Sequence, residues 1–143
     1  MTILADFEAE HRELENAVSM FATLLAEAQP PETHRLMSAR WRLTFLISRH
    51  VSVEDTHLYP IISKDMRPET SEIIGHFTGK IGILRQQFRD WQAKWSPESM
   101  AAEWAGFQAE SRALFRELQD RIMEEETLLF PLIAQAERKL AAG

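Results

Sequence analysis

The chain has 143 residues, 45% of them hydrophobic and 27% charged, which is typical of one soluble globular domain. Its formal net charge of −6 argues against a nucleic-acid or anionic-membrane surface, because both partners require clustered Lys and Arg. The absence of cysteine excludes disulfides, thiolate metal ligands and thiol catalysis.

The sequence carries no signal for a membrane or for secretion. No apolar run approaches membrane-spanning length, and the N-terminal stretch MTILADFEAEHRELE lacks the basic and apolar regions of a secretion signal. We therefore expect a cytoplasmic protein with no membrane partner, folded as a single domain over residues 1–143.

Prolines divide the chain into long segments that have a helical period and no alternating strand pattern. The predicted elements are four helices, at residues 3–28, 32–59, 68–94 and 97–130, with a short tail after Pro131. Ser96 precedes Pro97 as an N-cap residue does, and Pro68 opens a helix in the same way. Helices of this length with short connections predict an all-α fold, an up-down-up-down antiparallel four-helix bundle.

The first helix has an apolar seam that contains one histidine. Residues spaced alternately by three and four positions form this seam: Phe7, His11, Leu14, Val18, Phe21 and Leu25. His11 is therefore expected to point into the bundle. In the third helix the main stripe consists of Ile74, Phe77, Ile81, Leu84, Phe88, Trp91 and Trp95, with His76 beside it.

The second and fourth helices share a motif. Residues 50–60 read HVSVEDTHLYP and residues 121–131 read RIMEEETLLFP, so that a glutamate, a threonine, a leucine and a proline coincide. The head of the motif differs, because His50 in the first copy corresponds to Arg121 in the second. The second and fourth helices also have an apolar seam, and helical spacing continues each seam through the motif. In the second helix the seam passes through His50, Glu54, His57 and Ile61. In the fourth it passes through Arg121, Glu125, Leu128 and Leu132.

Buried polar groups cost several kcal/mol each unless they are paired, so their recurrence in one core calls for a common explanation. In an up-down bundle a similar number of residues separates each inward polar residue from its nearest bundle end. Because a helix rises about 1.5 Å per residue, these residues lie at a similar height on all four helices. Six residues are therefore expected to face one another: His11, His50, Glu54, His76, Arg121 and Glu125.

This set of residue types favours a metal site. A histidine and a glutamate at positions i and i+4 lie on one helical face and can bind the same ion or adjacent ions. Helix bundles build dinuclear iron or manganese sites from such pairs. Nitrogen and oxygen ligands without sulfur favour iron, manganese or zinc.

At these residues the chain resembles the hemerythrin-like family, in its HHE cation-binding branch. The matching stretches are EHREL around His11, IGHFTGK around His76, and the two proline-terminated motifs at 50–60 and 121–131. The resemblance implies a non-haem di-iron centre in which Glu54 and Glu125 bridge the metals. It implies His11, His50 and His76 as terminal ligands.

Arg121 departs from the family pattern, since it stands where the family has a further histidine ligand. Arginine stays protonated and offers only donors, so it cannot coordinate a metal. Three outcomes remain open: two metals with water or another side chain in the gap, one metal in the better-furnished position, or none. In the last case Arg121 neutralises the carboxylates by salt bridges. Because the seam places these residues inside the bundle, we expect Arg121 to pair with Glu54 as well as Glu125. His57 is a candidate replacement ligand.

The preferred hypothesis is a hemerythrin-like iron protein, with one or two metals, that senses, stores or binds dioxygen, nitric oxide or iron itself. Manganese and zinc are alternative metals. An enzyme is not favoured, because no motif supplies a nucleophile with an activating base or a phosphate-binding loop. The alternative is a metal-free interaction or dimerisation bundle in which Arg121 forms a buried salt-bridge network. The aromatic stripe of the third helix suggests a homodimer.

Overall fold

The computed structural model describes residues 3–62, 64 and 67–142, and every regular element within this part of the chain is a helix. In chain order the elements are α1 (Ile3–Leu25), α2 (Thr33–Val53), η1 (Glu54–Leu58), α3 (Tyr59–Ile62), α4 (Pro68–Lys94), α5 (Pro97–Ala102), α6 (Trp104–Glu124), η2 (Glu125–Leu129) and α7 (Phe130–Ala142). The elements η1 and η2 are π-helical turns. The predicted all-α class is confirmed, although the described residues form more helical segments than the four that were predicted.

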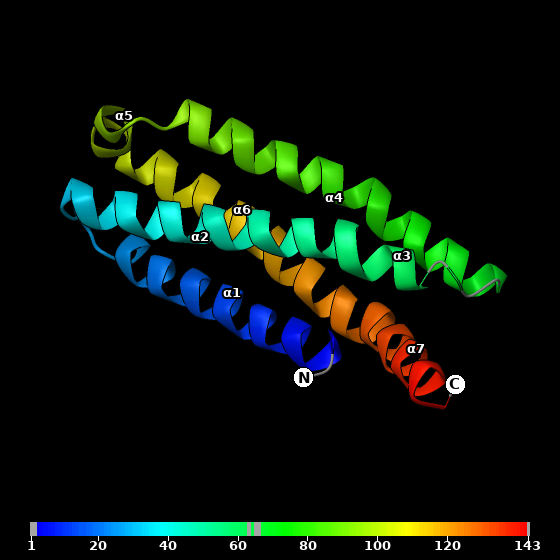
Figure 1. The fold of residues 1–143 in the computed structure, drawn as a ribbon. Coiled ribbons are helices and arrows are strands. Elements are labelled where there is room, and N and C mark those ends of the chain that lie inside the picture. The colour runs from blue at the N-terminus through cyan, green and yellow to red at the C-terminus, as the bar shows by residue number, and fades with distance from the viewer. Residues whose placement is uncertain (1–2, 63, 65–66, 143) are drawn as a thin grey trace.

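The long helices lie lengthwise beside one another (Figure 1). Helix α1 packs against α2, α6 and α7, and α4 packs against α6. The short helix α5 lies at one end of the molecule, whereas α3 and α7 lie at the other end and contact each other (Figure 1). None of the helices in the described ranges is both long enough and apolar enough to cross a membrane.

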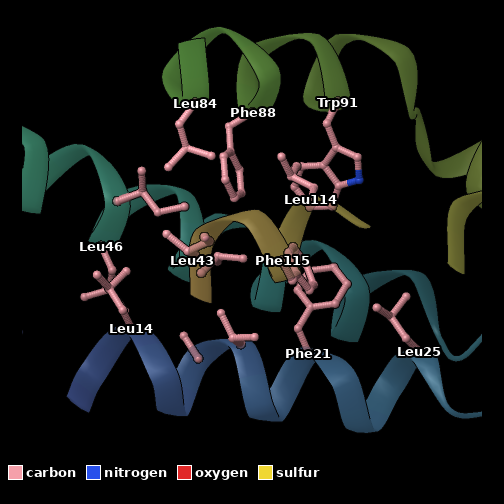
Figure 2. Close-up of a cluster of buried hydrophobic side chains, with 14 of the residues drawn as sticks. Leu14, Phe21, Leu25, Leu43, Leu46, Leu84, Phe88, Trp91, Leu114 and Phe115 are labelled. Atoms are coloured by element: carbon pink, nitrogen blue, oxygen red, sulfur yellow. The ribbon is translucent and has the colours of Figure 1, made fainter. Parts of the chain in front are cut away.

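Two apolar clusters fill the interior. The larger one is shown in Figure 2, where side chains of α1 meet side chains of α2, α4 and α6, and it includes Leu14, Phe21, Leu43, Trp91 and Phe115. The smaller one is built from these residues: Phe7, Leu58, Tyr59, Ile62, Phe77, Leu129, Phe130 and Ile133. Along α1, Phe7 belongs to the smaller cluster and Leu14 to the larger one, so His11 lies between two water-excluding regions.

The predicted helix at 97–130 is wrong in its continuity. Its start is confirmed, because the Ser96 side chain accepts a hydrogen bond from the Ser99 N–H in a capping box, with Pro97 in the first turn. The helix then breaks at Glu103, whose backbone angles of −123° and 50° are not helical. Residues 101–105 contain neither proline nor glycine, so residue type gave no signal for this break.

The short tail predicted after Pro131 is also wrong, because the chain continues as helix α7 to Ala142. Pro131 is the second residue of α7 and directly follows the π-helical turn η2. Proline is tolerated in the first turn of a helical segment, where its missing N–H is not needed. Helix α7 buries Ile133 and lies against α1, where Glu137 accepts a hydrogen bond from the Leu4 N–H at 2.6 Å.

Candidate metal centre

Each copy of the repeated motif contains one π-helical turn, and each turn begins at the motif glutamate. The Tyr59 N–H donates to the Glu54 carbonyl across η1, and the Phe130 N–H donates to the Glu125 carbonyl across η2. A π turn adds one residue to the helical repeat, and such turns occur frequently at functional sites. Both glutamates point inward, with 0% and 1% of the residue surface of Glu54 and Glu125 exposed.

The π turns overturn the predicted seam beyond the glutamates. The added residue rotates the helix, so that Leu58 and Leu129 are buried in place of His57 and Leu128. His57 is exposed and lies outside the cluster, and Leu128 is 41% exposed. The expectation that His57 lies on the buried seam is therefore wrong.

Five of the six predicted residues meet in the interior: His11, His50, Glu54, Arg121 and Glu125 are all buried. One carboxylate oxygen, Glu125 Oε1, lies 2.7 Å from His11 Nε2 and 2.9 Å from His50 Nε2. The ligand atoms of His11, His50 and Glu125 all lie within 4.8 Å of one another, as the ligands of a metal ion do.

Glu54 brings a further oxygen to the same place. Its Oε1 atom lies 2.8 Å from His50 Nε2, but that nitrogen is directed at Glu125 Oε1. Among the residues that the structure describes, no donor makes a hydrogen bond to Glu54 Oε1. A fully buried carboxylate oxygen without a hydrogen bond needs a proton or a cation beside it.

The outer ring nitrogens of both histidines also face carboxylates. His50 Nδ1 lies 2.7 Å from Glu10 Oε1, and His11 Nδ1 lies 3.2 Å from Glu126 Oε1. A neutral imidazole has one N–H, so a ring with carboxylates at both nitrogens must be doubly protonated or must bind a cation through one nitrogen. Carboxylates behind ligating histidines are the usual outer shell of metal sites.

Sequence reasoning missed Glu10 and Glu126. The Glu126 side chain is 47% exposed, yet it reaches His11. Glu10 directly precedes His11 and is not on the apolar seam. Their signal is only their position next to a site residue, which many surface glutamates share.

Arg121 occupies the opposite side of the two glutamates. Its Nε donates to Glu125 Oε2 at 2.6 Å, and its Nη2 donates to Glu54 Oε2 at 3.4 Å. Its Nη1 donates to the Phe77 carbonyl at 3.1 Å, and its Cζ lies 4.5 Å from the centroid of the Phe77 ring. The predicted pairing of Arg121 with both glutamates is confirmed.

His76 does not join the other five residues. Its side chain is 40% exposed, and its Nε2 lies 2.9 Å from Glu124 Oε2. The neighbouring Phe77 is fully buried instead and contacts Arg121 by its ring and its carbonyl. The expectation that His76 faces the cluster is therefore wrong. The apolar stripe of α4, which includes Phe77, faces the interior, and His76 lies beside that stripe at the surface.

The two glutamates have opposite pKa shifts. Burial raises the pKa of Glu54 to about 7, and the charge of Glu125 adds to this rise against the opposing effect of His50. Burial would raise the pKa of Glu125 too, but hydrogen bonds from His11 and His50 outweigh it and hold that pKa well below its usual value. Without a metal, Glu54 thus retains a proton more readily than Glu125 does.

The protonated forms of His50 and Arg121 are stabilised by the same carboxylates, those of Glu54 and Glu125. Burial alone would lower the pKa of His50, but the carboxylates of Glu10, Glu125 and Glu54 around it raise it well above the usual value. Burial likewise opposes the charge of Arg121, but Glu125 and Glu54 outweigh it and raise the pKa of Arg121. The carboxylates of the centre therefore stabilise positive charge that lies between them.

A small cavity adjoins the centre. It measures about 20 Å³ and is lined by His50, Arg121 and Glu125 together with aliphatic side chains of α1, α2, α4 and α6. A cavity of this size accommodates about one water-sized molecule. The site therefore has room beside it for a very small ligand.

The all-helical fold and its buried nitrogen and oxygen donors define the class: a helical protein with a candidate cation site. The family described as Hemerythrin HHE cation binding domain matches residues 2–133, and the chain belongs to this family. No curated protein and no solved structure matches the chain.

Proposed function

We propose that the protein binds a transition-metal cation at His11, His50, Glu54 and Glu125, and that iron is the metal. Two imidazoles and two carboxylates without sulfur suit iron, with manganese and zinc as alternatives. The membership of the chain in a cation-binding family supports this proposal. When bound, the metal supplies a centre for binding a small ligand, and the protein residues hold and screen it.

One observation carries the proposal most directly. Glu54 Oε1 is completely buried and accepts no hydrogen bond from the described residues, although it lies 2.8 Å from His50 Nε2. The same histidine nitrogen lies 2.9 Å from Glu125 Oε1, which also lies 2.7 Å from His11 Nε2. Four electron-rich atoms this close together repel one another unless protons or a cation lie between them.

We propose further that the metal serves to sense, store or bind a small ligand, either dioxygen, nitric oxide or iron itself. The adjoining cavity supports a diatomic ligand, because its largely aliphatic wall favours a small apolar molecule over water. An enzymatic role is not part of the proposal. The donor set binds a cation, and no nucleophile with an activating base was recognised in the sequence.

The proposal includes the setting of the site. We place it in one domain of up-down-up-down form, counting α2 with η1 and α3 as one rod and α6 with η2 and α7 as another. We place the protein in the cytoplasm, without nucleic acid or membrane as a partner. A homodimer remains a proposal as well; Trp41 and Phe45 stack at 5.5 Å on the surface of α2 and are 70% and 49% exposed.

A second candidate function rests on the Arg121 contacts. A guanidinium that pairs with both glutamates already neutralises part of their charge, which is what a metal-free interaction bundle would need. In that case the centre is a structural salt-bridge network. The two candidates differ in whether removal of metal changes the protein.

The deciding experiment is elemental analysis of protein produced in iron-rich medium and purified without chelators or a metal-affinity column. We expect transition metal bound to the native chain, a near-ultraviolet band that changes in air, and a melting temperature that falls with chelator. Glu125→Gln should abolish retention of the metal, because Glu125 Oε1 faces both histidines.

Glu117→Gln is the matched control, since Glu117 is an exposed glutamate of α6, the helix that directly precedes η2, and should leave the metal content unchanged. Native protein that holds no transition metal, and melts at the same temperature with or without chelator, would instead support the metal-free bundle.

A further inference from the structure

The glutamate pair has two distinct sides, which receive different partners. The Oε1 atoms of Glu54 and Glu125 face His50, and Glu125 Oε1 also faces His11. The Oε2 atoms of both residues face Arg121. Two carboxylates can hold a cation on either side, and here one side is already filled by a guanidinium that belongs to the protein.

Arg121 is fixed in this place by contacts to three separate elements. It donates to Glu125 at the start of η2, to Glu54 at the start of η1 and to the Phe77 carbonyl of α4. The face of its guanidinium lies over the Phe77 ring, and only 7% of its side chain is exposed. A side chain with its charge paired and its plane packed in this way does not leave readily to admit a metal ion.

We infer that Arg121 is a built-in cation that limits the centre to one metal ion, held on the Oε1 side by His11, His50, Glu54 and Glu125. This inference rests on the proposed function and specifies it. The side chain does not ligate the ion; it determines how many ions the glutamate pair accepts. It does so by its charge and by occupying the Oε2 side of both carboxylates.

The positions of the charged groups favour a single ion. Glu54 and Glu125 supply two negative charges, and Arg121 with one divalent ion supplies three positive charges. Glu10 and Glu126, at the outer nitrogens of the two histidines, supply two further negative charges, which gives a net charge of −1 with one divalent ion and +1 with two. The sum of charges does not distinguish the two cases, so the positions of the charges decide. A second divalent ion on the Oε2 side would be repelled by the first ion and by Arg121, whose guanidinium already contacts both Oε2 atoms.

The test counts ions per chain. Metal-free full-length protein is incubated with excess Fe²⁺ under anaerobic conditions, desalted and analysed for iron and protein. In parallel, Mn²⁺ is added and the electron paramagnetic resonance spectrum is recorded, because two adjacent manganese ions couple magnetically and one isolated ion does not. We expect one ion per chain and an uncoupled Mn²⁺ spectrum for the native protein.

Arg121→His removes the guanidinium and adds an imidazole, and it should raise the count to two ions per chain with a coupled Mn²⁺ spectrum. Arg116→His is the matched control, because it makes the same replacement at an exposed position of α6 and should leave the count at one. Arg121→Gln keeps a hydrogen-bonding side chain without the charge and should also raise uptake above one ion.

The outcomes separate this inference from the proposed function. Native protein that binds no ion would refute metal binding itself, and the inference with it. Native protein that binds two coupled ions would overturn the inference while leaving the proposed function intact. A count that stays at one in both folded Arg121 variants would likewise overturn it, because the limit would then not depend on the guanidinium.

Discussion

The two copies of the repeated motif, at 50–60 and 121–131, have the same backbone and different chemistry. In each copy a long helix ends just before the motif glutamate, and a five-residue π-helical turn begins with that glutamate. A new helical segment then begins with an aromatic residue and a proline. The shared leucine is buried in both, at Leu58 and Leu129. What the copies share therefore corresponds to backbone geometry and packing.

The first residue of each motif, His50 or Arg121, contacts a different side of the glutamate pair. His50 directs its Nε2 toward the Oε1 atoms, whereas Arg121 directs its Nε and Nη2 toward the Oε2 atoms. The same helical position, four residues before the glutamate, thus carries a candidate metal ligand in one copy and a guanidinium cation in the other. The different residue at this one position therefore gives the two segments contacts to opposite sides of the glutamates.

The largest effect is expected from making the two heads alike. His50→Arg replaces the ligand of the first copy with a second guanidinium, which cannot coordinate a metal and adds positive charge beside Arg121. Loss of an outer-shell partner alone lowers metal affinity about 10- to 100-fold, so loss of this ligand should weaken Fe²⁺ binding by more than about 100-fold. Anaerobic competition with a coloured chelator measures the affinity.

His57→Arg is the control for that prediction, because it makes the same replacement in the same motif at an exposed side chain. Its Fe²⁺ affinity should match that of the native protein. Equal loss of binding in the two variants would show that added charge, rather than the ligand at position 50, causes the effect.

Sequence periodicity predicts this arrangement as far as the two glutamates and no further. The spacing of three and four residues correctly buried His11, His50, Glu54, Arg121 and Glu125. It then failed at His57 and Leu128, because each π turn adds one residue to the repeat. Pro60 and Pro131 follow the two π turns and so mark where the helical repeat changes. They do not reveal that a helix continues beyond each turn.

Other parts of the site depend on contacts that no periodic pattern contains. His76 lies one position from the buried stripe of α4, which is about 100° around the helix axis, and Phe77 rather than His76 faces Arg121. Glu10 and Glu126 reach the histidines from the edge of the site with long, partly exposed side chains. Such side chains have many rotamers, so their partners follow from tertiary packing alone.

The opposite pKa shifts of Glu54 and Glu125 sharpen the comparison between the copies. The pKa of Glu54 is raised from 4.5 to about 7, so the folded metal-free protein binds more protons than the unfolded chain between these values. Its stability should therefore fall as pH rises through this window, by up to about 3 kcal/mol at 1.36 kcal/mol per pKa unit. His50, whose pKa is raised, stabilises below pH 6.5 and loses this contribution as pH rises further.

Glu125 acts in the other direction, since its lowered pKa gives stability above pH 4.5 that is lost as pH falls through its folded value. Urea denaturation of metal-free protein between about pH 5 and 8 isolates the decline due to Glu54 and His50. Glu54→Gln should flatten the lower part of that decline. A native free energy of unfolding that rises over the same range would contradict the assignment of the two shifts.

The smallest effect concerns the aromatic residue that directly follows each π turn. The Tyr59 hydroxyl donates a hydrogen bond to Glu54 Oε2 at 3.4 Å. Phe130, at the same position of the second copy, packs on the His11 ring with the ring centroids 4.8 Å apart. Tyr59→Phe makes the copies alike here and should lower the free energy of unfolding by about 0.5 kcal/mol, the low end for a hydrogen bond of this length.

A double-mutant cycle assigns that loss to its partner. In a Glu54→Gln background the hydroxyl no longer meets a carboxylate, so Tyr59→Phe should cost less than it does in the native chain. An equal cost in both backgrounds would mean that the hydroxyl stabilises the protein through something other than Glu54. The Tyr59 hydroxyl would then not act on the glutamate pair, and the contrast between His50 and Arg121 would be the difference between the copies that bears on these two carboxylates.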